Sequence, residues 1–290
     1  MALASPATLR TDTLWIAGGL YGNPEALESL LELYEREPGA KALVFNGDFH
    51  WFDADAAQFG AINRGVLGHV ALRGNVEAEL ADPLQGAGCG CAYPDFVSDE
   101  VVEHSNRIIE RLRAQAPPAE LQALRALPMH LVAEVAGERI GIVHGDAESL
   151  AGWGFSQEVL ATAPGREAAR RSLAAAGVRV FAASHTCLPV LQSFDGGGIV
   201  VNNGAAGMPN FRGTRFGLAT RISVRPRLRA LYAARAGRLH VEAHALRYDH
   251  GAFLRRFERL WPAGSDAHAS YHGRLAHGPA YELPLARRAA

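Results

Sequence analysis

The chain has 290 residues, 48% of them hydrophobic, and its 29 lysines and arginines nearly balance its 30 aspartates and glutamates. This balance excludes a global basic field that would attract nucleic acid or an anionic membrane, so any anionic ligand has to be held locally. The length and apolar content suit a single α/β domain with insertions, spanning residues 1–290.

Targeting signals and cysteine content give two further expectations. No apolar stretch approaches the roughly 20 residues that cross a bilayer, and residues 1–15 lack the charged-then-apolar order of a signal peptide. We therefore expect a cytoplasmic protein with no membrane partner. The three cysteines, an odd and sparse number, do not describe a disulfide scaffold, so we expect reduced thiols.

The first part of the chain alternates short apolar runs with amphipathic segments. The apolar runs cover residues 13–18, 41–46 and 69–73, and the amphipathic segments cover residues 24–37 and 53–67. This β-α-β-α-β order is typical of a mostly parallel sheet.

The pattern changes between residues 86 and 118, where a loop rich in glycine and cysteine leads into an amphipathic segment. Ser98 is placed to cap a helix there, so we expect a helical insertion that lies over the sheet. Strand patterns dominate the second half, with helices over residues 165–177 and 251–261. The segment 262–290 is rich in Gly, Ser, His and Pro, which predicts a loop draped over the body.

Four apolar runs are followed by polar residues that can bind a metal ion: Asp48, Asn75, His144 and His185. In open α/β sheets the ligand crevice lies at the carboxyl ends of the strands, so we expect these side chains to converge. Carboxylate, amide and imidazole donors form a hard-to-borderline set, which favours Mn, Fe, Zn or Ni over Ca or a soft thiophilic ion. The sequence therefore predicts a transition-metal site.

A series of short motifs accompanies these residues in chain order. They read GNPEAL, NGDFHWFD, RGNVE, VHGD, SHTCLP and NNGAAGMPN, and they run roughly from Trp15 to Asn210. The series resembles that of the calcineurin-like metallophosphoesterases, whose pattern is DxH, GDxxD, GNH(D/E), H and GHxH, and a whole series in order is more specific than one motif. The resemblance implies an α/β (α+β) fold of two packed mixed β-sheets flanked by helices, with metal ions that bind a phosphoester and activate water.

By this resemblance, Asp48 is the carboxylate that bridges two metal ions. Asn75, His144 and His185 then complete the second metal site, where Asn75 also contacts the substrate. The chain departs from the family pattern at four positions: Gly19, Tyr21, Val76 and Cys187 replace the first Asp, the first His, the His of GNH and the last His. Asp48 is the one ligand left to the first site, so we expect one divalent transition-metal ion and no complete site for a second.

Three residues are candidates to replace the missing groups. Tyr21 as phenolate and Cys187 as thiolate can each bind a metal, and His50 can face the same pocket or act as a catalytic acid. The alternatives are that Tyr21 and Cys187 only pack around the vacated site and that His50 lies in a surface loop. Arg212 is a candidate for substrate binding, because a guanidinium can fork onto phosphate oxygens.

These features predict a metal-dependent phosphoesterase that hydrolyses a phosphomonoester or phosphodiester with metal-activated water. Its partner is then a small phosphorylated substrate. One alternative is a fold-mate that binds a phosphorylated ligand or a partner without cleaving it. Another is a rebuilt metal site with non-hydrolytic chemistry.

Two further features allow more than one interpretation. Cys89 and Cys91, spaced C-x-C, are either an extra metal or redox pair or a tight loop with two reduced thiols. The second interpretation is preferred, because no second Cys/His pair is spaced as in a zinc site. His268, His272 and His277 either form a lid or proton relay or lie in a solvated loop.

Overall fold

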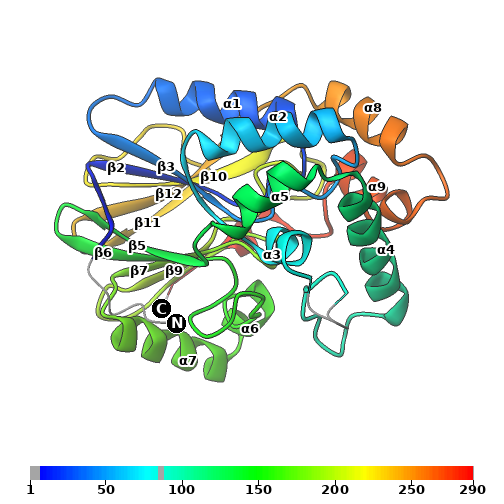
Figure 1. The fold of residues 1–290 in the computed structure, drawn as a ribbon. Coiled ribbons are helices and arrows are strands. Elements are labelled where there is room, and N and C mark those ends of the chain that lie inside the picture. The colour runs from blue at the N-terminus through cyan, green and yellow to red at the C-terminus, as the bar shows by residue number, and fades with distance from the viewer. Residues whose placement is uncertain (1–6, 84–87, 290) are drawn as a thin grey trace.

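The computed structural model describes residues 7–83 and 88–289. Two β-sheets pack face to face, with helices on their outer faces and beyond one end of the strands (Figure 1). The predicted fold class, two packed mixed β-sheets flanked by helices, is confirmed. Residues 86 and 87, where the predicted insertion begins, lie outside the described residues.

The six-stranded sheet contains the predicted N-terminal unit. Its three N-terminal strands run parallel to one another, and its three C-terminal strands extend the sheet in antiparallel fashion. In spatial order the strands are β11 (Tyr232–Ala236), β12 (Leu239–Leu246), β10 (Gly217–Ser223), β2 (Thr13–Ala17), β3 (Lys41–Asn46) and β4 (Val70–Leu72).

The seven-stranded sheet is also mixed. A hairpin that turns at Ala136 and Gly137 forms its strands β5 and β6, which pair antiparallel. In spatial order the strands are β1 (Leu9–Thr11), β5 (His130–Val135), β6 (Glu138–Val143), β7 (Val180–Ala183), β9 (Ile199–Asn202), β8 (Val190–Ser193) and β13 (Arg287–Arg288).

The main core lies between the two sheets. Ile16 and Val44 of the six-stranded sheet and Ile142 and Val201 of the seven-stranded sheet belong to one buried cluster. Such alternating aliphatic side chains are what two sheets stacked face to face require. The inner faces therefore fix the distance between the strands of one sheet and those of the other.

Helices cover the outer face of each sheet. Figure 1 shows α1 (Pro24–Glu35) and α2 (Ala56–Leu67) along the six-stranded sheet, with α7 (Ala163–Ala176) and α6 (Gln157–Ala161) along the other. Helix α8 (His250–Leu260) contacts α1 and α9 and lies beyond the strand ends. The start of α1 follows from its sequence: the Asn23 side chain accepts a hydrogen bond from the Ala26 N–H, and proline occupies the first turn.

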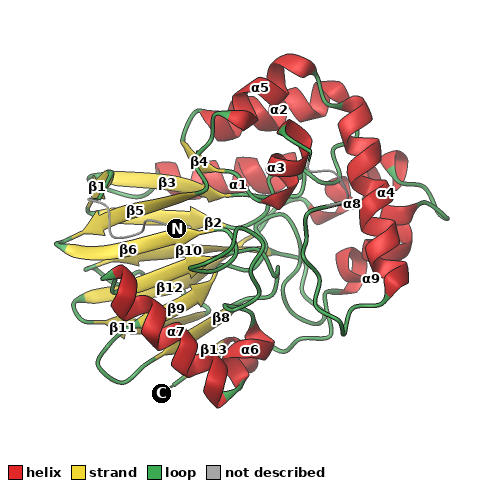
Figure 2. Cartoon of the chain, turned by 60° about the horizontal axis from the view of Figure 1, so that its bottom comes forward, coloured by secondary structure: helices red, strands yellow, loops and turns green. Residues whose placement is uncertain are grey.

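A further group of helices lies beyond the strand ends (Figure 2). It consists of α3 (Asn75–Ala81), α4 (Asp99–Gln115), α5 (Pro118–Arg125) and α9 (Asp266–His277). The insertion helix is thus present as predicted, but it packs on α3 and α9 at the strand ends and not over a sheet. None of the helices among the described residues is long and apolar enough to cross a membrane.

The prediction of a C-terminal loop over residues 262–290 is wrong. The segment contains helix α9, a 3-10 turn at η1 (Leu283–Ala286) and strand β13. Ala267, Tyr271 and Leu275 are spaced four residues apart, and they form the face of α9 that packs into the core. The glycine and the histidines around them are more typical of a loop, so composition alone did not indicate this helical period.

A buried ion cluster joins β10 to the end of α1. The Arg221 guanidinium donates to Glu37 at 2.8 Å and to Glu242 at 2.9 Å, and the three side chains are at most 4% exposed. Burial on its own would lower the pKa of Arg221, but the two carboxylates raise it overall. Buried charges of this kind are tolerated only as pairs.

We expect Arg221→Met to lower the free energy of unfolding by about 3–5 kcal/mol, because Glu242 loses its buried guanidinium partner. Urea denaturation followed by circular dichroism measures the change. Arg170→Met is the matched control, since Arg170 forms only an exposed pair with Glu167 and its loss should leave the transition midpoint in place. Equal midpoints for wild type and Arg221→Met would contradict a stabilising role for the cluster.

Candidate metal centre

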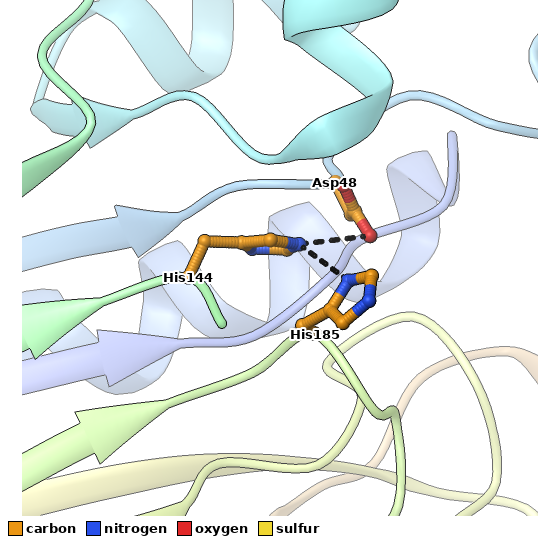
Figure 3. Close-up of side chains that lie close together, drawn as sticks. All are labelled: Asp48, His144 and His185. Atoms are coloured by element: carbon orange, nitrogen blue, oxygen red, sulfur yellow. Dashed lines mark hydrogen bonds and ion pairs between the residues drawn. The ribbon is translucent and has the colours of Figure 1, made fainter. Parts of the chain in front are cut away.

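The four predicted ligands meet where the two sheets end. Asp48 follows β3 and Asn75 begins α3 just after β4, both in the six-stranded sheet, whereas His144 follows β6 and His185 follows β7 in the seven-stranded sheet. All four side chains are buried, and Figure 3 shows Asp48, His144 and His185 pointing toward one another. The carboxyl ends of strands from both sheets thus build one centre, as the strand-end argument predicts.

The spacing of the donor atoms fits a metal ion. Asn75 Oδ1 lies 3.1 Å from His144 Nε2 and 2.9 Å from His185 Nδ1. His144 Nε2 lies 3.3 Å from both Asp48 Oδ2 and His185 Nδ1. Donors about 2.1 Å from one tetrahedral or octahedral ion lie about 3.0–3.4 Å from one another. Asp48, His144 and His185 accordingly form a group able to hold a metal ion.

Backbone carbonyls set the direction of both imidazole rings. His144 Nδ1 donates to the Asn46 carbonyl at 2.8 Å, and His185 Nε2 donates to the Cys91 carbonyl at 2.9 Å. A carbonyl oxygen only accepts, so the proton of each neutral ring lies on the nitrogen that faces away from the centre. The atoms facing inward are then two nitrogen lone pairs, an amide oxygen and a carboxylate. Four acceptors without a donor call for a cation, and hydrogen bonds to the outer ring nitrogens are typical of metal-binding histidines.

The charges at the centre also favour a bound cation. Burial on its own would raise the pKa of Asp48, but His144 lowers it overall, so the group is a carboxylate at neutral pH. Burial would lower the pKa of His144, and Asp48 raises it overall. Burial together with His144 lowers the pKa of His185 to about 4. The Asp48 carboxylate thus favours positive charge at the centre, as the raised pKa of His144 shows, and the neutral His185 ring does not oppose it.

Two glycines let the loops approach this closely. A Cβ at Gly74 would lie 2.3 Å from Asp48 Oδ1, and a Cβ at Gly47 would lie 2.6 Å from His144 Nδ1. Gly47 also has φ 78°, a left-handed conformation that suits glycine. The glycines of the NGD and GN motifs are therefore required by the packing of the ligands.

Tyr21 and Cys187 contact each other beside the centre. Tyr21 Oη lies 2.7 Å from Cys187 Sγ, and a Cβ at Gly19 would lie 2.3 Å from Tyr21 Cζ. The tyrosine ring thus fills the space next to Gly19. Burial raises the pKa of Tyr21, and Cys187 and Asp48 raise it further; burial also raises the pKa of the Cys187 thiol. Both groups keep their protons near neutral pH, and their role as ligands or catalytic groups stays a prediction.

His50 does not lie in a surface loop, and that prediction is wrong. Its side chain is fully buried, with Nδ1 2.6 Å from Asp53 Oδ2 and Nε2 2.8 Å from Asn63 Oδ1. The ring also stacks on Phe59 at a centroid distance of 3.6 Å. Both ring nitrogens are therefore used inside the protein, and His50 is not among the described residues that line the cavity at the centre.

Arg212 is likewise absent from the cavity. It is exposed and forms an ion pair with Glu282 at 2.6 Å. His268, His272 and His277 lie on α9, where the first two rings stack on each other and His272 contacts Glu258. None of the three is among the described residues that line the cavity.

Cys89 and Cys91 are joined in a disulfide, so the expectation of two reduced thiols is wrong. Their loop lies directly against the candidate ligands. The Cys89 carbonyl accepts from Asn75 Nδ2 at 3.0 Å, which turns Asn75 Oδ1 toward the centre. The Cys91 carbonyl accepts from His185 and also from Trp153 Nε1 at 3.2 Å. The C-x-C loop therefore orients two of the four candidate ligands through its backbone.

A cavity of about 290 Å³ opens onto the centre. Asp48, Asn75 and His185 belong to its lining, together with residues of the insertion, the loop before α6, helix α9 and the loops next to the ligands, Tyr21 and Cys187 among them. Tyr271 and Arg274 of α9 reach it although sequence reasoning missed both, because their segment was expected to be a loop. The spacing of Ala267, Tyr271 and Leu275 was the signal that could have found them.

The packed mixed sheets and the Asp/His group at the strand ends define a calcineurin-like metallophosphoesterase fold. The structure is similar to that of a metallophosphoesterase from Sphaerobacter thermophilus, with a TM-score of 0.60 and 15% identity over 92% of this chain and 100% of the other. It is also similar to a hypothetical protein from Pyrococcus horikoshii OT3, with a TM-score of 0.62 and 17% identity over 94% of this chain and 100% of the other. No family model and no curated protein matches the chain.

We expect Gly19→Ala to destabilise the protein by about 1–3 kcal/mol, because the new methyl group overlaps the Tyr21 ring. In a Tyr21→Gly background the same change should cost little, so a double-mutant cycle measured by urea unfolding should show coupling between the two positions. Gly273→Ala on α9 is the control, since nothing lies within 4 Å of a Cβ there. Additive effects of Gly19→Ala and Tyr21→Gly would show that the ring does not fill this space.

Proposed function

We propose that this protein is a metal-dependent phosphoesterase that hydrolyses a small phosphomonoester or phosphodiester at a mononuclear centre. The observation that carries the proposal is the convergence of four acceptor atoms from both sheets at an accessible cavity. The metallophosphoesterase fold supports it. A cytoplasmic location stays a prediction from the N-terminal sequence.

Each candidate ligand has a defined task in this proposal. Asp48, Asn75, His144 and His185 hold one divalent ion, with Mn, Fe, Zn or Ni suited to the mixed oxygen and nitrogen donors. When bound, such an ion polarises a phosphoryl group and activates water. Asp48 contributes one negative charge against two positive charges, so the loaded site attracts an anion. Asn75 also lines the cavity, which supports its predicted contact with the substrate.

The residues that occupy the first-site positions support a single bound ion. The Tyr21 ring packs over Gly19, and the thiol of Cys187 faces the tyrosine hydroxyl. These three positions correspond to the missing aspartate and histidines, so Asp48 alone would have to hold a second ion. Binding of Cys187 to the ion would require its thiol to lose a proton, which burial opposes.

The proposed reaction lacks an evident general acid that could protonate the leaving group. Val76 stands where the resemblance places a histidine, and the ring of His50 is bonded to Asp53 and Asn63. His185 is the one histidine among the described residues that line the cavity, and its ring is oriented to bind the metal ion. The same observations favour a second candidate function, in which the protein binds a phosphorylated ligand or partner without cleaving it.

We expect about one equivalent of transition metal per chain in protein purified without added metal, and close to none in His185→Ala, because that change removes one of the converging donors. Elemental analysis by mass spectrometry measures both. His272→Ala is the control, since His272 is bonded to Glu258 on the surface and should leave the metal content unchanged. Two equivalents in the wild type would contradict the mononuclear proposal, and full content in His185→Ala would contradict the ligand set.

We expect the metal-loaded protein to hydrolyse methyl 4-nitrophenyl phosphate at least about 100-fold faster than it releases methanol from dimethyl phosphate. An activated aryl leaving group needs little protonation, whereas loss of a general acid typically costs about 10²–10⁴-fold. Steady-state assays at neutral pH measure the ratio, and Asp48→Asn should abolish turnover of both esters. No turnover with Mn, Fe, Co, Ni or Zn would favour the binding function, and fast release of methanol would mean that another acid is present.

A further inference from the structure

Arg274 has a guanidinium whose charge is not matched by a carboxylate. Its Nη2 donates to the Cys187 carbonyl at 2.8 Å and its Nε to the Pro209 carbonyl at 3.3 Å. Among the described residues no carboxylate lies within ion-pair distance of it, and Nη1 has no hydrogen-bond partner. A half-buried guanidinium fixed by two neutral carbonyls retains its full charge for an anion.

This guanidinium lines the same cavity as the candidate ligands. Asp48 and His185 lie among its lining residues. Arg274 is the one lysine or arginine among the described residues of the lining. One guanidinium together with one divalent ion can neutralise a single phosphoryl group. A second phosphate would find no further cationic side chain among the described lining residues. The charges therefore favour a substrate with one phosphoryl group over a polyphosphate.

Aromatic side chains form much of the remaining wall. Trp51, Tyr93, Trp153 and Tyr271 all line the cavity, and Val97 and Val101 add aliphatic surface from the insertion. Flat apolar groups pack well against such side chains, which give up little conformational freedom. A cavity of about 150 Å³ accommodates a benzene ring, so a volume of about 290 Å³ has room for one ring beside a phosphoryl group.

We propose that the site takes a phosphoester with a single phosphoryl group and one flat apolar arm, and that Arg274 binds a non-bridging phosphoryl oxygen. This inference rests on the proposed phosphoesterase function, since it names the substrate class of the same site. Arg274 takes the place that the sequence reasoning gave to Arg212. Helix α9 supplies both the cation and, through Tyr271, part of the aromatic wall.

The test measures binding without turnover. Phenylphosphonate, methylphosphonate and pyrophosphate are titrated into the metal-loaded protein by isothermal calorimetry. Phenylphosphonate should bind at least about 10-fold more tightly than methylphosphonate, because its ring is buried against the aromatic wall, and more tightly than pyrophosphate. Arg274→Gln should weaken both phosphonates about 10- to 100-fold with metal content unchanged, since a charged hydrogen bond is lost. Tyr271→Ala should reduce the preference for phenyl over methyl.

Two variants keep the result interpretable. Arg274→Lys retains a cation and should recover part of the affinity lost in Arg274→Gln. If the role of Arg274 were purely structural, the phosphonate affinity would not depend on the charge at this position. Arg259→Gln, on the exposed side of α8, should leave all affinities unchanged. Equal phosphonate affinities in wild type and Arg274→Gln would overturn the inference, even if aryl esters are hydrolysed. Phosphonate binding that depends on Arg274 without hydrolysis of any ester would support it and reject the phosphoesterase function.

Discussion

The buried carboxylate of Glu77 fixes the relative position of the two loops that carry Asp48 and Asn75. It accepts hydrogen bonds from the backbone N–H groups of Asp48 at 2.7 Å, Gly74 at 2.8 Å and His50 at 3.3 Å. Burial raises the pKa of Glu77, and the Asp48 carboxylate raises it further; the N–H donors oppose this cost. Because β3 and β4 end at these loops, the positions of Asp48 and Asn75 depend on a side chain that is not itself a ligand.

Three residues around the centre have a left-handed backbone conformation although they are not glycine. Tyr21, Asp48 and Cys187 have φ angles of 53°, 54° and 61°, a left-handed conformation that is unfavourable for residues with a Cβ. All three lie around the centre, where tight loops bring strand ends together. The tyrosine ring and the thiol then fill the space that Gly19 leaves open. Tyr21 and Cys187 are therefore part of the packing beside the candidate ligands.

Sequence reasoning succeeds where chemistry and strand position coincide. Asp48 and His144 could be predicted because a polar residue after a buried strand must lie at the sheet edge, and the motif order supplied the register. The burial of His50 could not, because its hydrogen bond to Asn63 and its stacking on Phe59 depend on how α2 packs. Arg274 was missed for a related reason: helix α9, which contains a glycine and three histidines, is stabilised by tertiary packing of Tyr271 and its neighbours, which composition does not reveal.

The insertion links the geometry of the ligands to the shape of the cavity. The loop that contains Cys91 orients His185 through its carbonyl and receives the Trp153 indole N–H on the same oxygen. Trp153 also lines the cavity, so one oxygen joins a candidate ligand to the aromatic wall. Helix α9 closes the other side and packs on α4, which follows this loop in the insertion. The positions of Trp153 and His185 are therefore coupled through this oxygen, and a shift of the Trp153 ring would change the hydrogen bond that orients the His185 ring.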